Sequence, residues 1–275
     1  MYPIGDVTLE LNDAVCHTPV DDTLWPILIC LLGDFRVLKG GHPISLNGGK
    51  AEHLLRCLGL EPDQPVPRDM LLETMWPGHP PDLAGQSLNS LTYSLRKMLG
   101  DEIGGDTPVV HEDGYYRLNQ AAGVGVDVTW FENLIKAGDH HMLSNNLTVA
   151  VSFYTQAARL YRGDLCAGTD IHCVMVRERL RAHFLTILAH LADYCFATED
   201  YGRCLHYADQ LLKNDACRED AHRLVMRCYV RRGERAQALR QYRLCVDILY
   251  AEFDAVPEQQ TVQLYDQVRL TPHTV

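Results

Sequence analysis

Two segments in the C-terminal half of this chain align at an offset of 34 residues, and this repetition constrains the fold more than any other feature. The segments are DYCFATEDYGRCLHYADQLL and CYVRRGERAQALRQYRLCV, and their turn residues TEDYG and RRGER also correspond. A period of this length indicates stacked helix pairs, because each pair buries its apolar face only against its neighbours. The aligned positions are Leu191 with Val225, Cys195 with Tyr229, Cys204 with Ala238, Leu205 with Leu239 and Ala208 with Tyr242.

Thirty-four residues is the period of a tetratricopeptide helix pair. A related pair of amphipathic segments precedes the two copies, at residues 130–137 and 147–161. We therefore expect residues 127–275 to form an all-α, tetratricopeptide-like repeat domain. Such stacks leave a concave surface on which a partner can bind.

The residues before the repeats follow a different pattern. Strand-like residues ILICLLGDFRVLKGG and HPISLN meet at a Gly-Gly turn, which predicts a small antiparallel sheet. Helices are expected over residues 50–58, with Gly59 as the stop, and over residues 68–76 after Pro67. A loop rich in Pro, Gly and Asp, PGHPPDLAG, follows the second helix.

A third helix and a β-hairpin complete this part of the chain. In SLNSLTYSLRKMLGD, residues 87–101, Leu88, Leu91, Leu95 and Leu99 recur every three or four residues, so one stripe faces a core. Residues 109–119, VVHEDGYYRLN, predict a hairpin that turns at Gly114. A helix that can enter a groove, beside a hairpin that can lie on a phosphate backbone, is the arrangement of a winged helix-turn-helix. DNA is therefore the first partner to consider.

The overall charge opposes a nucleic-acid partner. The net charge is −11 and the pI about 5.6, so the chain has no global field that attracts DNA. Residues 1–25 hold five acids and no Lys or Arg, and we expect an acidic extension that is ordered in part at best. Residues 26–119 are the expected winged-helix domain, and residues 120–126 the expected linker to the repeats. Neither domain has an excess of Lys and Arg, so any DNA binding must rest on local charge.

Cysteine usage and the N-terminal residues indicate the compartment. The ten Cys include no Cys-x-x-Cys pair, and the first residues, MYPIGDVTLELND, carry acids where a secretory leader has basic residues. The apolar run at residues 25–32 is too short to span a bilayer. We therefore expect a cytoplasmic protein with reduced thiols and no membrane partner. No zinc-type spacing, phosphate loop or catalytic constellation occurs, so we expect no metal, no cofactor and no catalytic site.

The motifs and their order resemble those of the Streptomyces antibiotic regulatory protein (SARP) family. FRVLKGGHPISL, RDMLLETMWPGHPP, SLNSLTYSLRKMLGD and GYYRL resemble an OmpR/PhoB-type winged helix. VDVTWFENLIKAG, YRGDL, VRERLRAHFLTILAHLADY and ALRQYRLCVDILYAEFDAVPEQQTVQLY resemble the bacterial transcriptional activator domain that follows it in that family. The resemblance covers roughly residues 28–270. It implies an α+β winged helix-turn-helix followed by the all-α repeat domain.

The resemblance also implies which residues meet DNA. The third helix of such a domain enters the major groove, where Asn and Arg read bases and the last cations meet phosphates. Many relatives carry Arg or His where this helix has Leu91 and Ser94, so fewer cations are available here. The expected DNA-facing positions on the helix are Ser87, Asn89, Ser90, Thr92, Tyr93, Arg96 and Lys97.

Three further cations are candidates for backbone phosphates: Arg117 in the wing, and Lys50 and Arg68 at helix starts. For each of them a solvated surface charge is an equally good interpretation. Glu112 and Asp113 beside the wing would also repel a phosphate. The loop at residues 78–85 corresponds to the one that touches RNA polymerase in OmpR-type activators.

The favoured function is a transcription activator that binds direct repeats as a homodimer and recruits RNA polymerase through the repeat domain. The alternative is a protein-interaction adaptor whose winged helix has lost DNA binding, as the acidic balance suggests. An enzyme is the least favoured class. The repeats carry seven Arg that either form a basic surface or pair with Glu219, Asp220 and Glu234: Arg223, Arg227, Arg231, Arg232, Arg235, Arg240 and Arg243.

Overall fold

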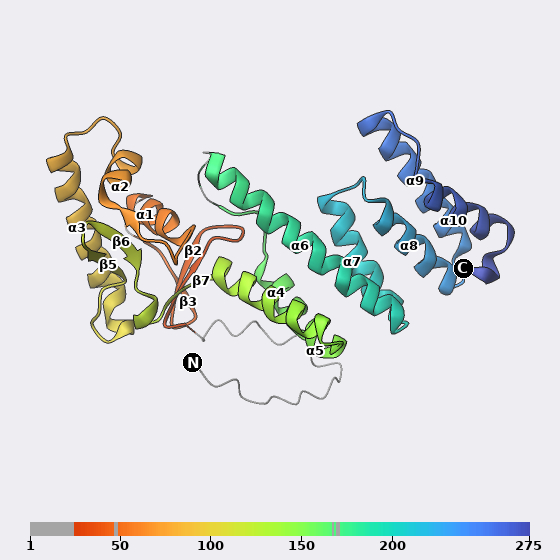
Figure 1. Ribbon diagram of the computed structural model, residues 1–275, viewed down its shortest axis with the longest axis horizontal. Helices are drawn as coiled ribbons and strands as arrows, with labels where there is room; N and C mark the ends of the chain where they lie inside the picture. The colour runs from red at the N-terminus through yellow and green to blue at the C-terminus, as the bar shows by residue number, and fades with distance from the viewer. Residues whose placement is uncertain (1–24, 47–48, 167, 169–170) are drawn as a thin grey trace. The chain divides into compact units, whose positions relative to one another are not determined.

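The computed structural model describes residues 25–46, 49–166, 168 and 171–275 (Figure 1). The expected acidic extension therefore lies outside the described residues, except for Trp25. The chain divides into two compact units, which meet between Val128 and Thr129. The order of elements, an α/β unit followed by an all-α unit, confirms the expected fold class.

The first unit contains two small sheets. The four-stranded sheet has the order β3-β2-β1-β7, in which β1 and β7 are parallel and the other pairs antiparallel. The three-stranded sheet, β4-β6-β5, is antiparallel. The strands are β1 Ile27–Cys30, β2 Arg36–Lys39, β3 His42–Ile44, β4 Val66–Pro67, β5 Val109–Glu112, β6 Tyr115–Leu118 and β7 Val124–Val126.

Two turns of this unit require unusual backbone angles. Gly40 and Gly41, between β2 and β3, both have positive φ. Asp113 and Gly114, between β5 and β6, have φ of 51° and 83°. Two central residues with positive φ give the turn that matches the twist of a β-hairpin, which explains the Asp-Gly pair.

Three helices, α1 Gly49–Gly59, α2 Arg68–Met75 and α3 Pro81–Leu99, bury one face each in the first unit. On α3 the buried side chains are Ala84, Leu88, Leu95 and Leu99, whereas Leu91 of the expected stripe is half-exposed. The helix begins at Pro81, within the stretch expected to be a loop. Proline is well placed in a first helical turn because its missing N–H would have no partner there, and Asp82 favours the same turn electrostatically.

The segment 120–126 is not the free linker that its small, uncharged residues suggest. Residues Gln120–Ala122 form a 3-10 turn, and β7 pairs with β1 in the four-stranded sheet. Asp127 closes this segment, since its buried carboxylate accepts hydrogen bonds from the amides of Leu31 (2.8 Å) and Leu32 (3.0 Å). Apolar Val124 and Val126 are buried, which is why these residues join the sheet.

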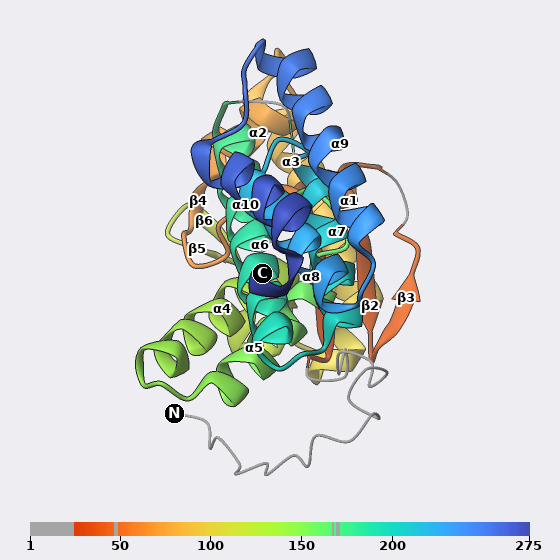
Figure 2. The same cartoon turned by 90° about the vertical axis from the view of Figure 1, so that its right-hand side faces the viewer.

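The second unit is a row of helices in which each helix from α5 to α10 packs against the next (Figure 1). Figure 2 shows the same helices from the side on which α9 and α10 lie. Helices α7 and α9 begin at Tyr201 and Arg235, 34 positions apart, as the repeat predicts. The equivalent positions Cys204 and Ala238 are both fully buried. The helices are α4 Asp127–Leu143, α5 Leu147–Leu160, α6 Ile171–Ala197, α7 Tyr201–Asn214, α8 Glu219–Arg231, α9 Arg235–Phe253 and α10 Gln259–Leu270.

Candidate nucleic-acid interface

The outer face of α3 is polar and open to solvent, and it lies in the same unit as the hairpin formed by β5 and β6 (Figure 1). Tyr93 is 71% exposed, and Thr92 is half-buried at the edge of the face. The other expected positions on the helix, Ser87, Asn89, Ser90, Arg96 and Lys97, are all exposed. The structure therefore brings the seven expected residues of the helix to one accessible surface.

The hydroxyl groups on this face already donate hydrogen bonds to the helix. Ser87 Oγ donates to the carbonyl of Leu83 (3.0 Å) and Ser90 Oγ to that of Gln86 (2.9 Å). Thr92 Oγ1 donates to the Asn89 carbonyl at 3.0 Å. These oxygens keep their lone pairs, so they can accept hydrogen bonds from base amino groups without losing the internal bond. Asn89 carries a side-chain amide, which donates and accepts at the same time, as bidentate recognition of adenine requires.

The two cations at the end of α3 differ in their surroundings. Arg96 Nη2 donates to the Gly105 carbonyl at 3.1 Å, in the turn that leads to β5. Lys97 is exposed and forms no ion pair with any residue in the described part of the chain. Both lie in the last helical turn, where a cation is also favoured by the helix dipole. Lys97 is thus the cation of this helix that is most available to a phosphate.

Lys50 is less available than its sequence position suggests. Its ammonium donates to the carbonyl of Met75, at the end of α2, and lies 5.3 Å from the centre of the Trp76 ring. The side chain therefore ties the start of α1 to the end of α2. An ammonium has three donors, so a phosphate can still approach the remaining two.

Arg68 connects α2 to both α3 and the hairpin. Its backbone amide donates to the Gly114 carbonyl at 2.9 Å, at the tip of the wing. Its guanidinium lies so close to Gly85 of α3 that a Cβ at that position would overlap it. Gly85 thus leaves room for Arg68, which is half-buried between two elements of the candidate interface.

The wing arginine is paired with an acid from the opposite strand. Arg117 Nη2 lies 3.1 Å from Glu112 Oε2, and both side chains are largely exposed. Such a surface pair is weak, so a phosphate can compete for the guanidinium. Of the two wing tyrosines, Tyr116 is buried and stacks on His111 at 4.2 Å, whereas Tyr115 is 47% exposed.

A shallow groove beside α3 includes residues that the sequence pattern did not single out. Its volume is about 630 Å³, and it lies where the start of α1 and the end of α2 meet α3. Leu91 and Ser94, the two positions that depart from the family pattern, are part of its wall. The lining residues are Lys50, Trp76, Leu83, Gln86, Ser87, Ser90, Leu91 and Ser94. The spacing of Leu83, Ser87, Ser90 and Ser94 along the helix could have indicated this surface, but its other walls come from distant residues.

Metal-type clusters and membrane-spanning helices are both lacking from the described ranges. No group of three or more His, Cys, Asp or Glu side chains in them is arranged to hold a metal ion. None of the helices in those ranges is both long and apolar enough to cross a membrane.

A polar helix beside a β-hairpin, in a chain that continues into stacked helix pairs, defines the class of winged-helix regulators with a helical-repeat domain. The sequence profile of the bacterial transcriptional activator domain matches residues 126–269, and the chain belongs to that family. The expected resemblance to SARP regulators is thereby confirmed.

Two curated relatives are regulatory proteins named AfsR. The chain is 22% identical over 239 residues to AfsR of Streptomyces coelicolor and 21% identical over the same length to AfsR of Streptomyces griseus. Each alignment covers 86% of this chain but 24% of the relative, so the chain spans about a quarter of the length of these relatives.

A solved structure shares the fold. It is that of Mycobacterium tuberculosis EmbR in complex with a low-affinity phosphopeptide, with a TM-score of 0.71 and 20% sequence identity. The match covers 89% of this chain and 65% of the EmbR chain. Because it extends over so much of this chain, the likeness supports the winged-helix unit as well as the repeats.

Proposed function

We propose that this protein is a sequence-specific DNA-binding transcription regulator, whose α3 enters the major groove and whose β5–β6 hairpin lies on the adjacent backbone. The observation that carries the proposal is the exposed polar face of α3, on which Asn89 and Lys97 are accessible and the Ser hydroxyls can accept. Asn89 reads a base, whereas Lys97, Arg96 and Arg68 hold phosphates.

The protein acts as an activator in this proposal, and two copies bind direct repeats. Few cations are free on the interface, because Lys50 and Arg117 have intramolecular partners, so one copy binds weakly. Linking two copies multiplies the affinity without any new contact to DNA. The second unit pairs the copies and contacts RNA polymerase, together with the short turn between α2 and α3.

Binding to DNA selected from a random duplex library tests this function. We expect Asn89→Ala to weaken binding to the selected sequence by roughly 10-fold, since a good base contact contributes about 1–3 kcal/mol, and to relax the preference at one base pair. Lys97→Ala should weaken binding to all sequences alike and reduce the salt dependence by about one unit. Arg243→Ala on α9 is the matched control, because Arg243 is exposed in the second unit.

The adaptor function is the second candidate, and the excess of acids in the first unit favours it. It predicts that no sequence is enriched from the library, even at low salt. It also predicts that Asn89→Ala and Lys97→Ala bind regulatory partners as the wild-type protein does. The absence of any enriched sequence would remove α3 as a DNA reader, whereas unchanged partner binding by the variants is compatible with both functions.

A further inference from the structure

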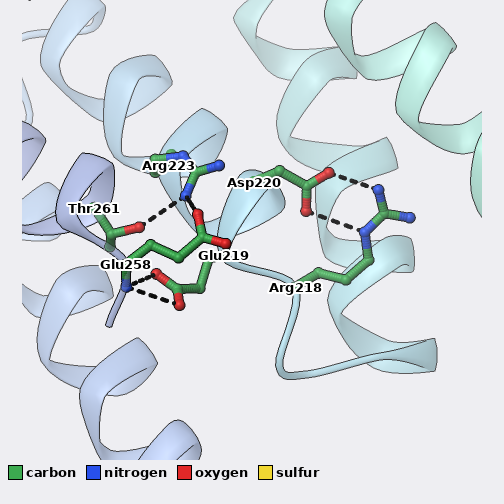
Figure 3. Close-up of polar contacts among 6 residues, drawn as sticks. All are labelled: Arg218, Glu219, Asp220, Arg223, Glu258 and Thr261. Carbon is green, nitrogen blue, oxygen red and sulfur yellow. Dashed lines mark hydrogen bonds and ion pairs between the residues drawn. The ribbon is translucent and has the colours of Figure 1, made fainter. Parts of the chain in front are cut away.

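Most arginines of the last four helices form intramolecular bonds. Arg218 binds both oxygens of Asp220, at 3.1 and 2.6 Å (Figure 3). Arg223 binds Glu258 at 2.8 Å and the buried Thr261 at 2.9 Å, which joins α8 to the start of α10 (Figure 3). These pairs leave little charge on their part of the surface.

Glu219, Asp220 and Glu234, the acids considered from the sequence as partners for the arginines, all form bonds with other groups. Glu219 accepts two bonds from the backbone amide of Glu258, at 3.0 and 2.9 Å (Figure 3). Asp220 is held by Arg218, and Glu234 pairs with Arg232 at 2.8 Å. None of the three acids forms an ion pair with Arg227 or Arg231.

Arg227 and Arg231, both on α8, therefore have no ion-pair partner among these three acids. Both are exposed, and neither forms an ion pair with a residue that the structure describes. They lie four positions apart, so their side chains neighbour each other on one helix face. We call this pair the arginine ridge.

A small cavity adjoins the ridge at Arg227. Its volume is about 190 Å³, roughly that of six water molecules in the liquid. The aliphatic part of its lining comes from α6, α7 and α8, namely Ala189, Leu211, Ala221 and Leu224. The rest of the lining is polar or charged (Asp193, Asp220, Arg223, Arg227 and Gln260), so the cavity offers an aliphatic side chain one apolar wall.

Two acids oppose an anionic ligand at this place, Asp193 and Asp220, of which Asp220 is already paired with Arg218. Asp193 of α6 lines the same cavity as Arg227. Desolvation raises the pKa of the Asp193 carboxyl, and Arg227 is among the charges that counteract this. In its ionised form Asp193 repels a neighbouring carboxylate.

We propose that the arginine ridge and its cavity bind an acidic helical segment of a partner protein. Two carboxylates, one helical turn apart, lie on Arg227 and Arg231, and one aliphatic side chain enters the cavity. Charge complementarity selects an acidic partner, because neither arginine of the ridge forms an ion pair with a described residue, although Asp193 lies on the same cavity as Arg227. This proposal specifies the partner of the second unit as an acidic helix. It does not require α3 to bind DNA, so the two proposals can fail separately.

Fluorescence anisotropy with the full-length protein tests the inference. The probe is a fluorescein-labelled, helix-forming peptide with Glu residues four positions apart and Leu beside them, and the same peptide with Gln in place of Glu is its control. We expect saturable binding of the Glu peptide that weakens with added salt. The double variant Arg227→Glu with Arg231→Glu should bind it at least about 10-fold less tightly, since two attractive charges become repulsive.

Two further variants make the outcome decisive. Asp193→Asn removes the repelling charge and should tighten binding of the Glu peptide about two- to fivefold. Arg240→Glu with Arg243→Glu changes the net charge by the same amount on α9 and should leave the affinity close to that of the wild-type protein. The inference is overturned if both double variants weaken binding equally, if Asp193→Asn weakens it, or if the Gln peptide binds as tightly as the Glu peptide.

Discussion

Asp127 shows how a single residue joins sequence segments almost a hundred positions apart. Its carboxylate is buried and accepts the amides of Leu31 and Leu32, at the point where β1 ends. Burial raises the pKa of this carboxyl to about 6, although the amide hydrogen bonds act in the opposite direction. The structure therefore uses a costly charge to satisfy two buried backbone donors.

The pH dependence of stability should reveal this carboxyl. The folded-state pKa lies above the ordinary value of 3.8, so the folded state binds the proton more tightly than the unfolded state does. The stability that Asp127 contributes is thus complete below about pH 4 and is lost as the pH rises towards 6. We expect the free energy of unfolding of the wild-type protein, relative to Asp127→Asn, to fall by roughly 2–3 kcal/mol over that range.

Urea unfolding of both proteins at several pH values measures this difference, in which the other titrating groups cancel. A difference that stays constant with pH, or that grows as the pH rises, would show that Asp127 does not titrate in this way. Asp127→Ala is the companion variant. It leaves both amides without an acceptor and should be less stable than the wild-type protein at every pH.

The positions of the candidate DNA-facing residues were predictable from sequence, whereas their intramolecular partners were not. The helical spacing alone places Asn89 and Lys97 on the outer face of α3. The bonds from Lys50 to the Met75 carbonyl and from Arg117 to Glu112 depend on how α2 and the wing pack. Sequence periodicity does not predict such contacts. These contacts nevertheless determine which cationic side chains can bind a ligand.

At the scale of elements, glycines inside helices play two different roles. Gly138 of α4 faces the ring of Tyr154 of α5, and a Cβ there would overlap that ring. Tyr154 is fully buried and donates to Asp139 at 2.7 Å, so it cannot move freely. Gly202 of α7 is exposed, and a Cβ there would meet only Asp200 Oδ1, at 3.7 Å.

Alanine at these two positions should act with opposite signs. In Gly138→Ala, overpacking costs about 1–3 kcal/mol against a gain of about 1 kcal/mol in helix propensity, so we expect a net loss of up to roughly 2 kcal/mol. In Gly202→Ala only the propensity term remains, and a gain of up to about 1 kcal/mol is expected. Chemical unfolding of both variants checks this, and a stabilising Gly138→Ala would show that α4 and α5 pack less closely than described.

The elements themselves were predictable where a periodic pattern or a turn residue marks them. The 34-residue repeat predicts the spacing between the starts of α7 and α9, and the Asp-Gly pair predicts the turn between β5 and β6. The start of α3 and the strand β7 were not predicted, because Pro, Gly and Ala in short segments resemble loops. Pro81 begins a helix because the nearby Ala84 is buried in the core of the unit. Gly125 lies in a strand because its neighbour Val126 is buried there.

Over the whole molecule, the net charge and the number of available cations limit the affinity for DNA that the proposed function requires. The chain carries −11, which repels DNA at long range, especially at low ionic strength. Four cations lie on or beside the face of α3: Lys50, Arg68, Arg96 and Lys97. Four phosphate contacts give a salt dependence with a slope of at most about −4 for one copy and about −7 for two.

The small number of phosphate contacts per copy leads to a prediction about the operator. On a duplex with one half-site we expect weak binding and a slope of log K against log salt between about −2 and −4. On a duplex with two directly repeated half-sites the slope should double, and affinity should rise by roughly 100-fold or more because the second copy binds at a high effective concentration. Adding half a helical turn between the half-sites is the control, since it places the two copies on opposite faces of the DNA and should abolish the gain. If one half-site already gives the full affinity and the full slope, one copy provides all the phosphate contacts, and some of them must come from residues outside the face of α3.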